Sequence, residues 1–258
     1  ADLTNRTGRR LPGRITSMEP DMPMTFTTAA APLCICVAGA GPAAAQASGH
    51  DHQAMEMMAD SVVPGKHLRL TPTWPEQPGD QARADSLVGA ARAALARYED
   101  VTTAEQAGYR MFAPKVRGQK VYHYSNRRNG LAARRTFDVT APSALLYKPQ
   151  RDGTLRLIGA MYTAPPDLSL EELDQRIPLS IAQWHQHTSI CLPPGATLAS
   201  MREGAGMGGR DPRFGPRGSI STEQACDAAG GTFKPRMFGW MVHVNVFEAP
   251  EQVWEHRH

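Results

Sequence analysis

The chain has 258 residues and a formal net charge of +3, and its 41% hydrophobic and 21% charged residues are typical of a globular protein. That length allows one large domain or two small ones. The basic residues are scattered and form no run interleaved with aromatic side chains, so nucleic acid is not expected as a partner.

An apolar run near the start, MTFTTAAAPLCICVAGAGPAAAQA (residues 24–47), ends in Ala45-Gln46-Ala47. This ending after a short apolar core is the cleavage signature of a secretory signal peptide, and the run is too short to indicate a transmembrane helix. We therefore expect residues 1–47 to comprise upstream residues plus a signal peptide. The mature protein is then periplasmic or secreted, with no stable membrane anchor after cleavage.

Residues 48–80 are polar and rich in proline, which predicts a flexible leader with little regular structure at its start. The stretch HDHQAMEMM gathers imidazole and thioether groups at His50, His52, Met55, Met57 and Met58. This combination suits copper, because thioethers select the cuprous ion. The alternative is a disordered terminus in which these residues occur by chance.

Periodicity predicts helices first and strands after them in residues 81–258. Apolar residues recur at helical spacing from Ala84 to Tyr98, with Asp80 as the N-cap, and a second short helix is expected at 102–109. Strands are expected at 120–126, around 145–147, and at 154–164, 183–191 and 238–250, with short helices capped by Ser169 and by Ser221 or Thr222. The fold class is therefore α+β, in a single domain with N-terminal helices followed by an antiparallel sheet curled into a partial barrel.

Two cysteines remain after signal cleavage, Cys191 and Cys226. An even pair in an oxidising compartment predicts one disulfide. In the alternative interpretation Cys191 is a thiolate metal ligand beside His185 and His187.

Four histidines lie in predicted strands: His123, His185, His187 and His243. Side chains alternate along a strand, so His185 and His187 share one face. Imidazoles on strand faces with aromatic neighbours need a partner, and convergence of all four would make a mononuclear metal site. Copper is the favoured ion and zinc the alternative. A histidine taken singly is more often a hydrogen-bonded core residue than a ligand.

Residues near these histidines have predicted supporting roles. Glu248 is the candidate general base, while Asn245 and Tyr124 are candidates to orient imidazole N–H groups. The methionines Met161, Met237 and Met241 are expected to pack in the core rather than to ligate. The sequence WHQH resembles the first HxH of cupin motifs. A cysteine and two prolines follow where a cupin has its glutamate, so the architecture is cupin-like at best.

These observations predict an exported metal-binding protein, with copper-dependent oxidoreductase activity as the possible catalytic role. A metal-delivery protein that uses HDHQAMEMM as a loading arm is one alternative. A zinc hydrolase is another, because zinc lowers the pKa of bound water toward 7. A third is a metal-free extracellular binding domain whose histidines line a pocket. The identity of a small-molecule or polymer substrate does not follow from the sequence.

The chain resembles a set of secreted bacterial proteins with no established activity. The resemblance rests on the order of five short motifs, GY, YHYSN, PSALLYKP, LIGAMYT and WMVHVNVFE. The resemblance covers about residues 104–250. It implies an exported single domain and no particular chemistry. The strand WHQHTSIC is not a feature of that whole set.

Overall fold

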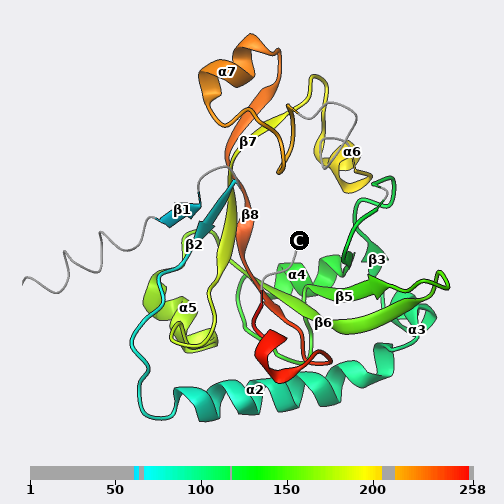
Figure 1. Cartoon of the computed structure of the whole chain (residues 1–258), viewed down its shortest axis with the longest axis vertical. Coiled ribbons are helices and arrows are strands. Elements are labelled where there is room, and N and C mark those ends of the chain that lie inside the picture. Colours follow the sequence, from blue (N-terminus) through cyan, green and yellow to red (C-terminus); the bar gives the residue numbers. More distant parts are fainter. Residues whose placement is uncertain (1–60, 64–66, 117, 205–212, 256–258) are drawn as a thin grey trace, which may run out of the picture. The chain divides into compact units, whose positions relative to one another are not determined.

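An eight-stranded antiparallel sheet forms the centre of the protein in the computed structural model, which describes residues 61–63, 67–116, 118–204 and 213–255 (Figure 1). The strand order is β1-β2-β7-β8-β6-β5-β4-β3. The strands are β1 (Ser61–Val63), β2 (Leu68–Leu70), β3 (Arg110–Met111), β4 (Tyr122–Ser125), β5 (Ala144–Pro149), β6 (Leu155–Ala164), β7 (His185–Leu192) and β8 (Thr232–Val244). The α+β class and the antiparallel sheet are confirmed, but strand pairing does not close the sheet into a barrel.

Helices precede the main strands and fill the connections between them. They are α2 (Asp80–Leu95), η1 (Ala96–Tyr98), α3 (Val101–Gln106), α4 (Arg127–Ala132), α5 (Leu170–Arg176), α6 (Leu198–Arg202), α7 (Glu223–Ala228) and η2 (Pro250–Gln252). Ser169 forms the expected capping box with Glu172, and Thr222 caps α7. Asp100, rather than a threonine, caps α3, and Gly79 rather than Asp80 precedes α2.

The predicted signal peptide and the His/Met stretch at 50–58 lie outside the described residues. The part of the leader that is described contributes β1 and β2 to the sheet, which the sequence did not indicate. Across the described ranges, none of the helices has the length and apolar character needed to span a membrane.

One face of the sheet packs against α2 and α5, and we call it the tyrosine face. Its buried Tyr124, Tyr147 and Tyr162 join one apolar cluster with Leu95 of α2 and Leu173 of α5. The hydroxyl of Tyr147 donates to the Tyr98 carbonyl at 2.6 Å, and that of Tyr162 donates to the Val139 carbonyl at 2.7 Å. The phenols of Tyr147 and Tyr162 are thus satisfied by backbone carbonyls, which ties β5 and β6 to the segments around them.

The sheet bends strongly between β6 and β8, and two glycines permit the bend. A side chain at Gly159 would collide with the carbonyl oxygen of Val244, and one at Gly239 would collide with that of Ala164. Only hydrogen atoms on these α-carbons let the two backbones approach so closely. The opposite face carries the four strand histidines, and we call it the histidine face. It is concave, because His123 and His243 meet across it although β5 and β6 lie between their strands.

Two backbone hydrogen bonds outside the sheet connect the segment after β3 with the end of α6. The Ala113 N–H, just after β3, donates to the Arg202 carbonyl of α6 at 2.7 Å, and the Lys115 N–H donates to the Glu203 carbonyl at 3.2 Å. Because α6 follows β7, these bonds tie the β3 edge to the segment beyond the other half of the sheet. The ion pair of Lys115 with Glu203 is exposed and contributes little.

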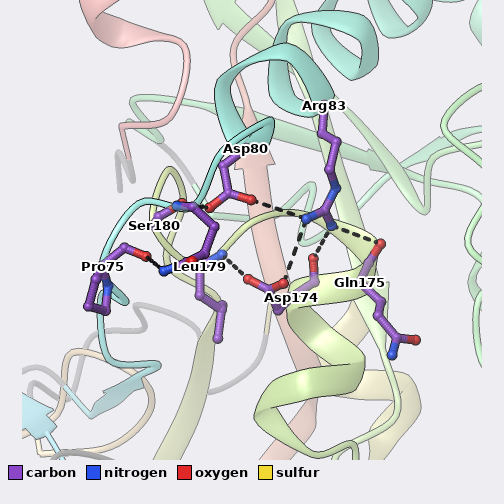
Figure 2. A network of polar contacts seen from close by, with 8 residues as sticks. Pro75, Asp80, Arg83, Asp174, Gln175, Leu179 and Ser180 are labelled. Atoms are coloured by element: carbon purple, nitrogen blue, oxygen red, sulfur yellow. Dashed lines mark hydrogen bonds and ion pairs between the residues drawn. The ribbon is translucent and has the colours of Figure 1, made fainter.

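A polar network fixes the start of α2 to the turn that leads into β7 (Figure 2). The Asp80 carboxylate accepts from the Ser180 hydroxyl at 2.6 Å and from the Arg83 guanidinium at 3.2 Å. Arg83 also donates to the Asp174 carbonyl at 2.6 Å, and the Asp174 carboxylate accepts the Leu179 N–H at 2.8 Å. The network thereby sets where the chain enters β7.

Replacing Gly159 by alanine should destabilise the fold by about 2 kcal/mol or more, because the new methyl group forces the β6 and β8 backbones apart. Urea unfolding followed by circular dichroism measures the change. Gly89→Ala is the matched control, since Gly89 lies within α2 with open space around it. That substitution should instead stabilise by about 0.5–1 kcal/mol. Equal effects at both sites would contradict the close approach at Gly159.

Asp80→Asn should destabilise the protein at neutral pH, with a pH dependence of known sign. The Ser180 hydroxyl, the Gln77 N–H and the Arg83 charge hold the pKa of Asp80 below its ordinary 3.8. A carboxyl with a depressed folded-state pKa adds stability above the unfolded value, and this is lost as the pH falls through the folded value. The urea midpoints of wild type and variant should therefore converge below pH 3.8. Asp85→Asn, at an exposed site on α2, should show no such convergence.

Candidate metal centre

The four strand histidines come together on the concave histidine face. His185 and His187 belong to β7 and His123 to β4, and His243 belongs to β8. The ring centroids are 5.8 Å apart for His185 and His187, 5.2 Å for His185 and His243, and 5.3 Å for His243 and His123. The imidazoles therefore form a continuous series across three strands.

The approach of His123 to His243 shows how far the sheet bends. The strands β5 and β6 lie between β4 and β8, so in a flat sheet the two backbones would stand about 14 Å apart. The Nε2 atoms of the two rings are 3.5 Å apart. The sheet is therefore curved between β4 and β8, and the close backbone approaches at Gly159 and Gly239 lie within this part of it.

Leucines and methionines stand directly opposite the four histidines in the sheet. The partners are Leu146 for His123, Met161 for His243, Leu70 and Met241 for His185, and Leu68 and Met237 for His187. Such neighbours remove water from the imidazoles without supplying charge. The four imidazoles therefore lie among apolar side chains, three of which are methionines.

This environment affects the protonation of two of the rings. Loss of solvation lowers the pKa of His123 to about 4. Burial likewise lowers the pKa of His187 to about 4, and the neighbouring His123 and His67 lower it further. Near pH 7 both rings are neutral, so each keeps one nitrogen lone pair.

Backbone strain gathers around the histidine face. Among the described residues, the non-glycine residues with positive φ are His67 (50°), Ala113 (53°), Ser189 (56°) and Phe238 (66°). Ser189 and Phe238 lie within β7 and β8, close to the positions where His187 pairs with Met237. Conformations of this kind cost about 1–3 kcal/mol each and cluster at functional sites.

His67 is a part of this region that sequence reasoning missed. Its ring is buried between β7 and the following loop, with Nδ1 2.8 Å from the Ser189 carbonyl oxygen and Nε2 2.7 Å from that of Gly218. Both nitrogens thus face backbone, which gives His67 a structural role. The alternating apolar and polar residues of HLRL (67–70) could have indicated a strand that places His67 in the sheet region. The prolines on both sides favoured a loop instead.

Two of the expected supporting residues are engaged elsewhere. The amide of Asn245 donates to the carbonyls of Gln252 and Glu255, both at 2.9 Å, and fixes the turn after β8. The last strand accordingly ends at Val244 rather than continuing to Pro250. Glu248 lies beyond that end, where its carboxylate forms an ion pair with Arg156 of β6. A role for Glu248 as general base stays a prediction.

The cysteines form the predicted disulfide. The Cys191–Cys226 bond joins β7 to α7, and both residues are fully buried beside Phe214 and Phe233. The alternative in which Cys191 is a thiolate ligand is therefore wrong, because its sulfur is already bonded. The disulfide fits an oxidising compartment outside the cytoplasm.

In the portions of the chain that are described, no group of three or more His, Cys, Asp or Glu side chains already has the geometry to hold a metal ion. The pair of His123 and His243 comes nearest, because ligand nitrogens of a tetrahedral metal with bonds of about 2.0–2.1 Å stand about 3.3 Å apart. Their Nε2 separation is 3.5 Å. The rings of His185 and His187 would have to turn to direct nitrogens to the same point.

No family model matches the chain, and no curated protein or solved structure matches it either. The site must therefore be interpreted from its own geometry.

Replacing both cysteines by serine should lower the free energy of unfolding by about 3–4 kcal/mol, since the bond closes a separation of 35 residues. Urea unfolding of the oxidised wild type and of the Cys191→Ser/Cys226→Ser variant measures the difference. When the wild type is treated with a thiol reductant under denaturing conditions, its urea midpoint should approach that of the variant. Equal midpoints for the oxidised wild type and the variant would contradict a stabilising role.

Proposed function

We propose that the protein is an exported copper-binding protein whose mononuclear centre is formed by His123, His185, His187 and His243. The observation that carries the proposal is the gathering of these four imidazoles, from three strands, on one concave and apolar face. His185 and His243 are buried and His123 and His187 are half-buried, so imidazole nitrogens meet in a region largely withdrawn from water. Imidazole is a natural ligand for copper and zinc.

The ring separations support a shared ion. Two imidazoles bound tetrahedrally to one metal have centroids about 5 Å apart, given metal–nitrogen bonds of about 2.0–2.1 Å. The pairs His185–His243 and His123–His243 lie at 5.2 and 5.3 Å. His243 is thus the central ligand of the proposed site. Rotation of the His185 and His187 rings about their side-chain bonds would complete it.

Copper is favoured over zinc on the chemistry of the donors. Divalent copper binds a given nitrogen site more tightly than zinc does. Catalytic and structural zinc sites are commonly completed by thiolate or carboxylate groups. Here Cys191 is held in a disulfide and Glu248 by Arg156, and the groups opposite the histidines are leucines and methionines.

Export is part of the proposal, and the disulfide supports it together with the A-x-A signature at Ala45–Ala47. In a periplasmic or secreted setting the site would be filled after the chain has crossed the membrane. The proposed role is copper binding; an oxidoreductase activity built on the same centre would need an open coordination position.

The test is elemental analysis of the exported wild-type protein beside a His123→Gln/His243→Gln variant. About one copper per chain is expected in the wild type after copper loading and dialysis, with loss of copper in the variant. Tyr122→Phe is the matched control, because Tyr122 neighbours His123 in β4 but points to the other face. It should keep its copper.

Circular dichroism and retention of the disulfide would show that the histidine variant is folded. Stoichiometric zinc in place of copper would contradict the assignment of copper but would still support a metal site at these histidines. Absence of bound metal from the loaded wild type would overturn the proposal and favour a metal-free binding domain.

A further inference from the structure

Met241 occupies a position between two of the proposed ligands. It stands directly opposite His185 in the β7–β8 pairing, and it precedes His243 by two residues on the same strand face. Directly opposite residues have β-carbons about 4.5–5.5 Å apart, which is within reach of a methionine sulfur. Its side chain is buried, with 5% exposure.

The other two methionines of the histidine face have apolar neighbours that explain them. Met237 packs with Ile190, Leu192 and Met201, and Met161 packs against Leu146 and its neighbours. Met241, although buried, belongs to none of the apolar clusters formed by the described residues. Its cross-strand partners are His185 of β7 and Thr163 of β6, and His243 follows two residues later on the same strand face.

We infer that the Met241 thioether is a ligand of the proposed centre and makes it a site for monovalent copper. The inference rests on the proposed function, which it extends to the oxidation state of the ion. Thioether sulfur is a soft donor that binds Cu(I) well and contributes little to zinc. The leucines and methionines opposite the histidines add no charge, which further favours the monovalent ion over a divalent one.

A flexible thioether also suits a site whose imidazoles must turn to bind. Methionine has three rotatable side-chain bonds and can follow the ion as the rings of His185 and His187 move. Cu(I) accepts two, three or four soft ligands, so His123 and His243 with Met241 would already hold it. The remaining imidazoles would then complete the coordination.

The experiment compares wild type with Met241→Leu, a substitution that keeps volume and burial but removes sulfur. Cu(I) affinity is measured anaerobically in ascorbate by competition with bicinchoninate, and Zn²⁺ affinity by competition with a chromophoric chelator. We expect Cu(I) affinity to fall about tenfold or more, as for loss of other groups that tune metal sites, with Zn²⁺ affinity nearly unchanged. X-ray absorption should show copper–sulfur scattering in wild type and none in the variant.

Met201→Leu is the matched control, because Met201 is a buried methionine in an apolar cluster. It should leave Cu(I) affinity unchanged. Equal Cu(I) affinity in wild type and Met241→Leu, or an equal loss in both variants, would overturn the role of Met241 while the histidine site stands. Failure of the wild type to bind any metal would instead overturn the proposed function.

Discussion

The contact of the β6 backbone with the β8 backbone determines the rest of the structure. At Gly159 and Gly239 the two strands approach so closely that a β-carbon has no room. The resulting bend separates the sheet into a convex tyrosine face, which takes the helices, and a concave histidine face. In a flat sheet His123 would lie three strand spacings from His243, and only the histidines of the adjacent strands β7 and β8 would be grouped.

The two faces of the sheet differ in the kinds of side chain they carry. The tyrosine face carries the largest cluster of buried apolar residues, and the phenols of Tyr147 and Tyr162 donate to backbone carbonyls. The histidine face carries strained residues, neutral imidazoles and methionines. The apolar packing and the imidazoles thus lie on opposite sides of the same strands. The hydrogen bonds from Ala113 to Arg202 and from Lys115 to Glu203 join the segment after β3 to the end of α6.

Local patterns were sufficient to predict the principal strands, the capped helix after Ser169, the disulfide and the shared face of His185 and His187. They could not predict which strands become neighbours, and so could not place His123 beside His243. The short strand β2 and the buried position of His67 could not be predicted from local patterns. Both depend on contacts with residues far along the chain, in β7 and at Gly218. The end of β8 at Val244 was not predicted either, since the turn after it depends on hydrogen bonds from Asn245 to the carbonyls of Gln252 and Glu255.

The separation of the faces has an evolutionary consequence. The imidazoles and thioethers of the histidine face lie away from the cluster that packs α2 and α5 on the sheet. A chain that keeps the tyrosines and the two glycines can exchange these donors and retain its architecture. Sequence change in related chains is therefore expected to concentrate on the histidine face, with the packing of α2 and α5 retained.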